Sequence, residues 1–584
     1  MNERIDKNSL AVVNLFDDSK LFVDKNNSFR IAFSGYLLNQ KEIIKNINDT
    51  DTVIKELSDA ELILELYRKY GNDCVKYLKG IFVFAIQKLE DNSLFLARDR
   101  VGGKILYYSI TKDTFIFAPD LKRILSEDLI ERRINKTALA QYLMLSYIPS
   151  PLSILENVYK LPAGHYLTIN SNGELEIEEY WDVVYDELNK ISDYGECKQL
   201  LRKTLFHAVE ECMEYDKDAG VLLSGGVDSN IITGIMSKIS DKPVNTFSIG
   251  CKDVKDYDES DRANLSAKFH RSNHQLFFIE YKNMLDNIEK VIDNIDEPYA
   301  DSSYLPTYTI SQIAGQHVKT VFTGDAGDEL FAGYNKYLIG HYSSIYKKIP
   351  TFLRNGVIKP IVGAMPANLK AVRKINKVID NSFLDTYSQR RNMMCLGVRF
   401  DDVNKLLTYD GSHSLDFIKT IYDKYESTAC ETDRTLYTDF KVVLEGDMLT
   451  KSNRTSELAG VVSIAPILHP DLVDLAAKIP VEYKIKAKDR KIILKDTFSD
   501  MVPDKIVKAK KTGFAVPISY WFQNELKVDL TDTLDRKIIE NQGLLNPEYV
   551  EILLDEHIKG KKNNSGILWA LYVFEKWYQK YFKK

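Results

Sequence analysis

Residues 221–229 have the sequence Val-Leu-Leu-Ser-Gly-Gly-Val-Asp-Ser, a glycine-rich turn that directly follows an apolar run. The pattern predicts a buried strand, then the turn and then a helix. Gly225 and Gly226 allow the backbone to curl so that several N–H groups face one anion, and the positive end of the helix dipole points at the same place. Asp228 would repel a bare phosphate, so it indicates a Mg²⁺ ion that bridges to the anion. We therefore expect a phosphate-binding turn, although a Walker loop would need a different spacing.

The sequence on either side of this turn predicts an α/β domain. The segments 244–250 and 319–334 are further apolar runs that end in polar or glycine-containing turns. Strands that alternate with helices favour a doubly wound parallel sheet. After about residue 335, most of the chain is expected to be helical.

The first 185 or so residues have a different organisation. Short apolar runs with turn residues between them predict strands over 10–16, 29–37, 81–87, 93–100, 104–110 and 114–120. A helix is predicted over 58–71, with Ser58 as its N-cap, Glu61 three residues later and Gly71 as its end. The polar stretch 183–196 is typical of a linker. We therefore predict two domains, 1–188 and 197–584.

Composition excludes several classes of protein. Of the 584 residues, 44% are hydrophobic and 28% are charged, as in ordinary globular proteins. The net charge of −6 argues against a general nucleic-acid binder. The six cysteines include no CxxC pair, so neither a zinc site nor a redox dithiol is indicated. There is no apolar run of about 18 residues and no signal-peptide pattern. We expect a cytoplasmic protein that binds neither nucleic acid nor membrane.

The hexapeptide at 224–229 resembles the pyrophosphate loop of the ATP pyrophosphatase group, which splits ATP to AMP and pyrophosphate. Other segments resemble the glutamine-dependent asparagine synthetases, in the right order and over nearly the whole chain. They are TFSIG (246–250), YDES (257–260), DEPYADSSYLPTY (296–308), TGDAGDELFAGY (323–334), MLTKSNR (448–454) and KKTGFAVPISYWF (510–522), with SDAELILELYRKYGNDCVKYLKGIFVFAI, LFLARDRVGGKILYY and YIPSPLSILENVYKLPAGHYL in the N-terminal half. The resemblance implies an N-terminal glutaminase-like α+β sandwich of the Ntn-hydrolase type. It implies a C-terminal ATP pyrophosphatase domain with helical additions.

The same resemblance implies ATP and Mg²⁺ as cofactors. Asp228 and Asp328 match the positions that hold the metal on the pyrophosphate. They lie a hundred residues apart, but each is on a turn after a buried strand, so they can converge at neighbouring strand ends. The nucleotide-binding set that the resemblance implies is Leu222, Ser224, Gly225, Gly226, Asp228, Ser229, Ser248, Ile249 and Gly324.

Three catalytic residues are implied as well. Asp325 matches an acidic position near the activated carboxyl, in the role of a base for the attacking amine; a turn-stabilising side chain is the alternative. Lys511 matches a lysine before Gly-Phe, where a cation neutralises the charge of departing pyrophosphate. Arg454 matches a basic position that faces the phosphates, and a surface ion pair is its alternative. The segment 296–303 is expected to form the wall between the ATP and acyl sites.

The N-terminal half departs from the family pattern. Members with glutaminase activity have a cysteine directly after the initiator Met, and this chain has Asn2 there. Cys74 is internal and has no free α-amine, so it cannot replace that nucleophile. The Asn-Gly-Glu that binds glutamine corresponds here to 34–36, Ser-Gly-Tyr. We therefore expect a degenerate domain without glutaminase activity, as in β-lactam synthetases and lasso-peptide cyclases.

The C-terminal half departs as well. Val462, Ile464 and His469 stand where the family has three charged residues, and Asn453 replaces an Asp. We expect a rebuilt, more apolar region beside the acyl pocket. Such a pocket disfavours aspartate, because buried unpaired charges cost several kcal/mol.

The favoured prediction is an ATP-dependent amide-forming ligase. It would adenylate a small-molecule or peptide carboxylate, release pyrophosphate and present the acyl group to an amine. An ammonia-dependent asparagine synthetase and a non-catalytic nucleotide-binding scaffold are the two alternatives. A homodimer also stays open.

Overall fold

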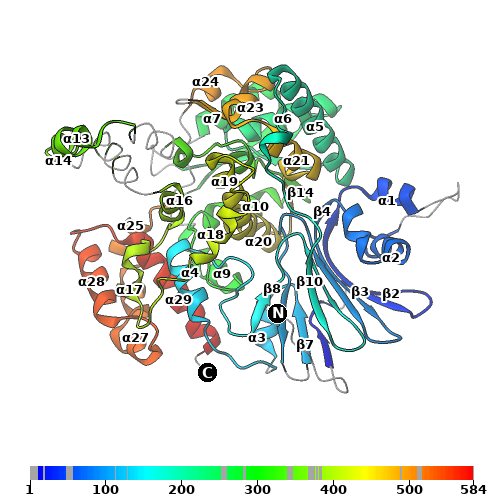
Figure 1. Ribbon diagram of the computed structural model, residues 1–584, viewed down its shortest axis with the longest axis horizontal. Coiled ribbons are helices and arrows are strands. Elements are labelled where there is room, and N and C mark those ends of the chain that lie inside the picture. The colour runs from blue at the N-terminus through cyan, green and yellow to red at the C-terminus, as the bar shows by residue number, and fades with distance from the viewer. Residues whose placement is uncertain are drawn as a thin grey trace.

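Two β-sheet systems organise the chain, one in each half, and helices cover both (Figure 1). The computed structural model describes residues 11–17, 20–47, 57–111, 114–127, 129–251, 260–279, 284–338, 346, 348–365, 372, 375, 379, 385–486, 489–509 and 516–582. No helix in this described part is long and apolar enough to cross a bilayer.

The N-terminal half stacks two sheets face to face. A six-stranded antiparallel sheet has the order β10-β9-β5-β4-β3-β2, and a four-stranded sheet has the order β1-β7-β6-β8. The strands are β1 (Ala11–Asn14), β2 (Leu21–Val23), β3 (Phe29–Leu37), β4 (Gly80–Lys88), β5 (Leu94–Arg98), β6 (Tyr107–Ile110), β7 (Thr114–Ala118), β8 (Val158–Lys160), β9 (His165–Ile169) and β10 (Leu175–Glu179).

Alternation of side chains along the strands builds four layers. On β4, Val83 packs between the two sheets, whereas Phe84 faces the helices α1 (Gln40–Ile47) and α2 (Asp59–Tyr70). On the outer face of the four-stranded sheet, Ile116 packs against α3 (Leu121–Ser126) and α4 (Lys136–Leu145). The expected α+β sandwich is confirmed.

The predicted helix after residue 58 is confirmed together with its caps. Ser58 accepts a hydrogen bond from the Glu61 N–H, and the Glu61 side chain reaches back to the Ser58 N–H. Gly71 is the C-cap of this helix, α2.

The C-terminal half is built on a parallel sheet of order β13-β12-β11-β14-β15. On one face, α5 and α6 pack against Val221 and Phe322. On the other face, α10 packs against Phe247 and Val321. The predicted doubly wound sheet is confirmed. Its strands are β11 (Gly220–Leu222), β12 (Asn245–Cys251), β13 (Asn273–Ile279), β14 (Thr320–Phe322) and β15 (Val462–Ile464).

Helices make up most of the remainder. The first of them, α5, begins three residues before the predicted start of the second domain at 197. The helices are α5 (Tyr194–Tyr215), α6 (Val227–Ile239), α7 (Ser260–His270), α9 (Ile288–Asn294), α10 (Tyr304–Ala314), α11 (Gly327–Leu330), α13 (Thr351–Leu353), π-helix η5 (Arg354–Ile358), α14 (Lys359–Gly363), α16 (Thr386–Met394), α17 (Val403–Leu406), α18 (Asp416–Asp423), α19 (Glu431–Thr438), π-helix η7 (Asp439–Leu449), α20 (Thr450–Leu458), α21 (Pro470–Lys478), α22 (Val481–Lys484), α23 (Ile492–Thr497), α24 (Asp504–Val507), α25 (Ile518–Gln523), α26 (Lys527–Thr533), α27 (Arg536–Gln542), α28 (Pro547–Ile558) and α29 (Ser565–Phe582). The 3₁₀ helices are η2 (Gly71–Tyr77), η3 (Glu187–Asn189), η6 (Phe400–Asp402) and η8 (Pro466–Leu468). The strand β16 (Ile485–Lys486) pairs with β17 (Asp489–Arg490).

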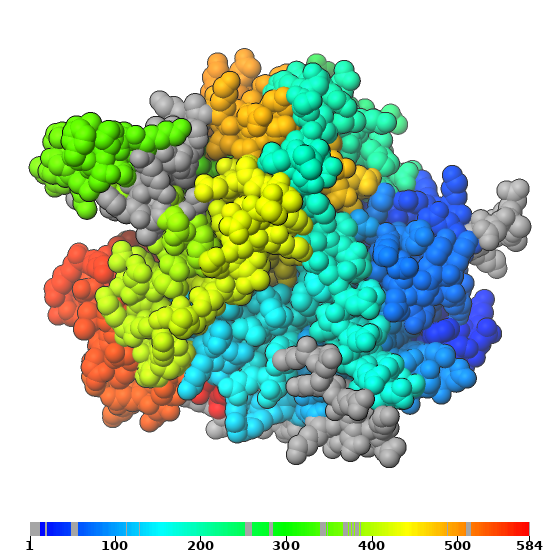
Figure 2. All heavy atoms as spheres, in the orientation of Figure 1, coloured from blue at the N-terminus to red at the C-terminus, as the bar shows by residue number. Residues whose placement is uncertain are grey.

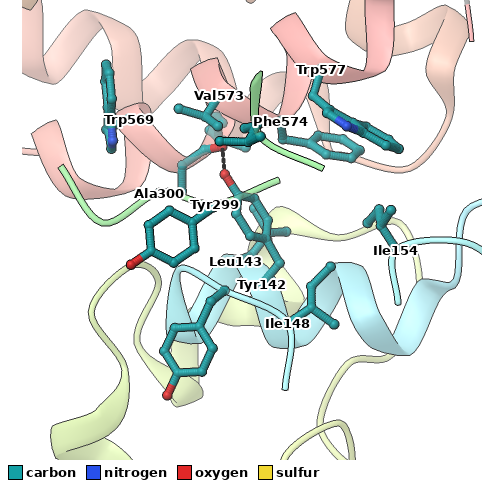
Figure 3. Close-up of a cluster of buried hydrophobic side chains, with 14 of the residues drawn as sticks. Tyr142, Leu143, Ile148, Ile154, Tyr299, Ala300, Trp569, Val573, Phe574 and Trp577 are labelled. Carbon is teal, nitrogen blue, oxygen red and sulfur yellow. Dashed lines mark hydrogen bonds between the residues drawn. The ribbon is translucent and has the colours of Figure 1, made fainter. Parts of the chain in front are cut away.

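The two halves share one hydrophobic core. Helix α4 of the N-terminal half packs against the C-terminal helix α29, and Tyr142 points toward Phe574 (Figure 3). The Tyr142 hydroxyl donates a hydrogen bond of 2.7 Å to the carbonyl of Ala570. This contact brings the end of the chain back onto its first half.

Candidate active site

The predicted anion-binding turn connects β11 to α6. Gly225 has a φ of 67°, and a Cβ added there would lie 2.8 Å from the Cβ of Arg262, so this position requires glycine. The Ser224 and Ser229 hydroxyls lie 3.1 Å apart, with Ser229 in the first turn of α6. The turn therefore presents two hydroxyls and the N-terminus of a 13-residue helix to the same space.

A second turn, which follows β14, packs tightly against the first. A Cβ added to Gly324 would lie 2.8 Å from the Cβ of Asp228, and one added to Gly327 would lie 2.6 Å from its Cγ. Because β11 and β14 are parallel neighbours, their carboxyl ends meet at one edge of the sheet. This edge is the point where the strand order reverses, which is where open α/β sheets bind ligands.

Lys491 joins the two aspartates at this edge. Its Nζ pairs with Asp228 and lies 2.8 Å from Oδ1 of Asp328. Burial alone would lower the pKa of Lys491, but the two carboxylates outweigh burial and raise that pKa above its ordinary value. The sequence did not identify Lys491 as a residue of this site. Its only visible pattern, a basic pair before the apolar run 492–494, does not differ from an ordinary helix start.

The donor set fits a magnesium ion. Both carboxylates reach one Nζ atom, so their oxygens are close enough to bind one cation. Carboxylate oxygens are also the ligands that Mg²⁺ prefers. Asp228 and Asp328 would hold the ion, with the Ser224–Ser229 turn beside them.

A cavity of about 520 Å³ opens over the two turns. It brings together eleven of the predicted site residues, although they come from three separate segments of the chain. These residues are Leu222, Ser224, Gly225, Gly226, Asp228, Ser229, Ser248, Ile249, Gly324, Asp325 and Asp328.

Asp325 is held in place by two hydroxyls. Its Oδ2 accepts hydrogen bonds from Thr323 at 2.9 Å and from Ser452 at 2.6 Å. Ser452 belongs to α20, so this contact ties the turn after β14 to a helix more than a hundred residues away in sequence. The carboxyl group is thereby oriented along the wall of the cavity.

A polar network forms another part of the wall. Lys451 donates to Asp301 and to Ser303, each at 2.9 Å, and all three residues line the cavity. Asp447 lies behind them and accepts a 2.5 Å hydrogen bond from Tyr299. Burial, and then the neighbouring Asp301 carboxylate, raise the pKa of Asp447 to about 7. Part of the segment 296–303 therefore forms a wall of this cavity.

Arg454 does not line the cavity. Its guanidinium forms a buried ion pair with Asp296 and donates to the carbonyl of Pro119 at 3.2 Å. Arg454 lies where the two halves of the protein meet, and its ion pair with Asp296 is buried, not on the surface as the alternative supposed. Lys511 lies outside the described residues.

The three replaced charges of the C-terminal half lie elsewhere than expected. Val462 and Ile464 belong to the edge strand β15, and none of the three lines the cavity. His469 is buried and its Nε2 lies 2.5 Å from Oε2 of Glu211, beside residues of the N-terminal half. None of the three positions therefore lines this cavity. The sequence alone does not reveal which elements pack on β15.

Tyr36 of the unusual 34–36 triplet also faces the joint between the halves. Its hydroxyl donates to the carbonyl of Ser463 at 3.2 Å, and its ring packs 5.3 Å from that of Tyr215. Burial raises the pKa of Tyr36 well above its ordinary value. At the position matched to the glutamine-binding Glu, the side chain is thus a buried tyrosine that contacts the C-terminal half.

Comparison with known proteins agrees with this architecture. Residues 200–579 match the family model described as asparagine synthase, and residues 5–181 match the glutamine amidotransferase domain. Asparagine synthetase [glutamine-hydrolyzing] 1 of Bacillus subtilis is 26% identical over 572 residues, which are 97% of this chain and 88% of that protein. A putative asparagine synthetase [glutamine-hydrolyzing] 2 of Methanocaldococcus jannaschii is 35% identical over 334 residues, 56% of this chain and 62% of that protein. A putative asparagine synthetase of Mycobacterium tuberculosis is 25% identical, over 94% of this chain and 84% of that protein. Since the first model spans well over half of the sequence, the chain belongs to the asparagine synthase family.

Proposed function

We propose that this protein is an ATP-dependent ligase that forms an amide bond through an acyl-adenylate. A carboxylate oxygen of the substrate attacks the α-phosphorus of ATP, and the bond to pyrophosphate breaks. The nitrogen of an amine then attacks the acyl carbon, the bond to AMP breaks, and a proton leaves the nitrogen. One observation carries the proposal: a single cavity holds the glycine-rich turn, both aspartates and Asp325.

The turn and its helix are assigned to the pyrophosphate. Backbone N–H groups at Gly225 and Gly226, the serine hydroxyls and the N-terminus of α6 would bind its oxygens. Mg²⁺ on Asp228 and Asp328 would neutralise charge as pyrophosphate forms. Lys491 is a fixed cation beside the same group, which favours the transition state electrostatically.

Adenosine and the amine are assigned to other residues of the cavity. The family resemblance assigns Leu222, Ser248, Ile249 and Gly324 to adenosine. The Ser248 hydroxyl donates to the carbonyl of Leu223, which holds β12 and β11 together below that site. Asp325 would accept the proton of the attacking amine, and the hydroxyls of Thr323 and Ser452 orient it for that task.

We further propose that the N-terminal half does not hydrolyse glutamine. The names of the relatives from Bacillus subtilis and Methanocaldococcus jannaschii include the term glutamine-hydrolyzing. In this chain, however, the buried Tyr36 stands at a position matched to glutamine binding and contacts Ser463 instead. The amine would then be free ammonia, a second substrate or a group on the acyl substrate itself.

Pyrophosphate release tests the proposed chemistry. The protein would be incubated with ATP, MgCl₂, ammonium and a panel of carboxylates that starts with aspartate. Asp228→Asn should reduce release by about a hundredfold or more. Asp218→Asn is the matched control, because Asp218 lies on the exposed surface before β11. Unchanged release in the Asp228 variant would refute the metal assignment.

The alternatives give different results in the same assay. Release that requires aspartate and ammonium would favour an ammonia-dependent asparagine synthetase. ATP binding without release on any carboxylate would favour a non-catalytic scaffold. Glutamate formation from glutamine by the wild-type protein would contradict the loss of glutaminase activity.

A further inference from the structure

A helical arm, residues 348–365, projects from the body of the C-terminal half (Figures 1 and 2). It contains α13, the π-helical turn η5 and α14, which follow one another without a break from Thr351 to Gly363. A helix of this length spans about 20 Å. That is too short to cross the hydrocarbon core of a bilayer, which is about 30 Å thick.

The arm is apolar on two faces, and the protein covers one of them. Ile358 and Val362 pack into a small cluster with Tyr346, Val372 and Ile379. On the other face the apolar side chains are exposed, with 72% of Phe352 and 54% of Ile361 accessible to solvent. The exposed set is Phe352, Leu353, Val357, Ile361 and Met365.

This concentration of exposed apolar side chains is unusual for the molecule. Nineteen large hydrophobic residues of the described chain are exposed, and five of them lie within residues 352–365. Residues 353, 357, 361 and 365 are spaced four apart, which places neighbouring side chains on one side of a helix. Exposed apolar side chains gathered on one short segment in this way mark an interaction site.

The charge of the surrounding sequence identifies the partner. From Leu330 to Ile379 there is no Asp or Glu, whereas the whole chain carries a net charge of −6. The same fifty residues contain Lys336, Lys347, Lys348, Arg354, Lys359, Lys370, Arg373, Lys374 and Lys377. Lys336 pairs with Asp439, whereas Lys348 and Lys359 are exposed on the arm itself. The surface that complements the arm is therefore negatively charged outside and apolar beneath.

We propose that the arm docks on an anionic lipid membrane. Phe352, Ile361 and their neighbours would enter the boundary between head groups and acyl chains, and Lys348 and Lys359 would contact anionic head groups. The helix would lie in the plane of the surface. The absence of a membrane-spanning run in the sequence does not bear on this mode of binding, which needs no span.

Vesicle flotation with the full-length protein tests this proposal. The protein should float with vesicles of equal parts phosphatidylglycerol and phosphatidylcholine, and added salt should weaken the binding. Phe352→Asp combined with Ile361→Asp should weaken binding by about tenfold or more, because each removes an apolar side chain that would enter the membrane. Lys348→Gln combined with Lys359→Gln should weaken it by roughly thirtyfold, since each lysine near an anionic surface contributes about 1 kcal/mol.

Val528→Asp is the matched control. Val528 is 69% exposed on α26, outside the arm, so this variant should float like the wild type. Failure of the wild type to float with anionic vesicles would overturn the proposal, as would equal flotation with pure phosphatidylcholine or an equal loss in the Val528 variant. A wild-type dimer that Phe352→Asp dissociates, without vesicle binding, would overturn it by assigning the face to a second copy.

Discussion

At the scale of single residues, Lys491 allows two buried carboxylates to lie side by side. Lys491→Met removes the cation from between Asp228 and Asp328, which should cost about 3–5 kcal/mol of stability in the absence of metal. Mg²⁺ should then replace the missing charge. We predict a lower melting temperature in EDTA and a larger rise with MgCl₂ than the wild type shows, measured by differential scanning fluorimetry.

Lys495→Met is the control for that experiment. Lys495 lies on α23, the helix that begins directly after Lys491, and lines the same cavity. Lys491, however, is the residue that forms the ion pairs with Asp228 and Asp328. Its removal should leave the response to MgCl₂ close to that of the wild type. Equal responses to MgCl₂ in the two variants would mean that the ion does not bind at Asp228 and Asp328.

The raised pKa of Asp447 predicts that the stability of the protein depends on pH. Its pKa is about 7 in the folded protein, against about 3.9 in an unfolded chain. The folded state therefore favours the protonated acid, so this contribution to stability is complete below about pH 4 and is lost as the pH rises through 7. Asn imitates the protonated acid at every pH. Asp447→Asn should gain about 3 kcal/mol relative to wild type between pH 5 and pH 8, measured by urea unfolding.

Asp301→Asn should change the stability of the protein in the opposite direction. Burial would raise the pKa of Asp301, but Lys451 and the Ser303 hydrogen bonds lower it overall. This carboxylate stabilises the folded state above its unfolded pKa, so its Asn variant should lose stability at pH 8. If stability changes in the same direction in Asp447→Asn and Asp301→Asn, the ionisation of these two carboxyl groups is not the source of the pH dependence.

These residues differ in how well the sequence predicts them. The members of the 224–229 turn could be placed because strand, turn and helix are local patterns and the carboxyl ends of parallel strands must meet. Arg454 and His469 could not be placed, because their partners Asp296 and Glu211 come from distant segments. Lys491 reaches the site from a part of the chain whose packing no periodicity reveals.

At the scale of elements, the site depends on how closely two turns approach each other. Gly327 begins α11, and a Cβ there would lie 2.6 Å from Cγ and Oδ1 of Asp228. Gly327→Ala must therefore displace the Asp228 carboxylate. We predict at least a tenfold loss of pyrophosphate release with little loss of stability, because the displaced group is the end of a side chain. Release assays and thermal unfolding measure the two effects.

Gly363→Ala is the matched control. Gly363 lies at the end of α14, and an added Cβ there meets nothing within 4 Å. Release should stay at the wild-type level, and stability should rise by up to about 1 kcal/mol, because alanine favours helix over glycine. Similar losses in the two variants would show that the close approach of the turns is not what positions Asp228.

Elements with local determinants follow from the sequence, and elements fixed by packing do not. The capping box of α2 and the apolar run of β4 were visible as patterns. The strand β15 could not be predicted from the sequence, because its three residues form a strand only through their pairing with β14. That pairing turns the following segment, with His469, toward the N-terminal half instead of the cavity.

At the scale of the whole molecule, buried ion pairs tie the two halves together. Arg98 of β5 pairs with Glu445 of η7 at 2.8 Å, and both side chains are buried. Lys160 of β8 likewise pairs with Glu297. Together with the contact of α4 and α29 in Figure 3, these pairs join the N-terminal sandwich to the parallel sheet. We therefore predict that the protein unfolds in a single calorimetric transition.

Arg98→Met tests this coupling, because it leaves the carboxylate of Glu445 buried without its cation. Such a loss costs about 3–5 kcal/mol. Lys424→Met is the matched control: it removes a pair with Asp182 that also joins the halves, but Lys424 is 38% exposed and exposed pairs contribute about 0–1 kcal/mol. In scanning calorimetry, Arg98→Met should lower the midpoint several times further than Lys424→Met, and neither should split the transition. A separate, earlier transition of the N-terminal half would mean that the shared core does not couple the two sheets, and the midpoint shift would then report on the sandwich alone.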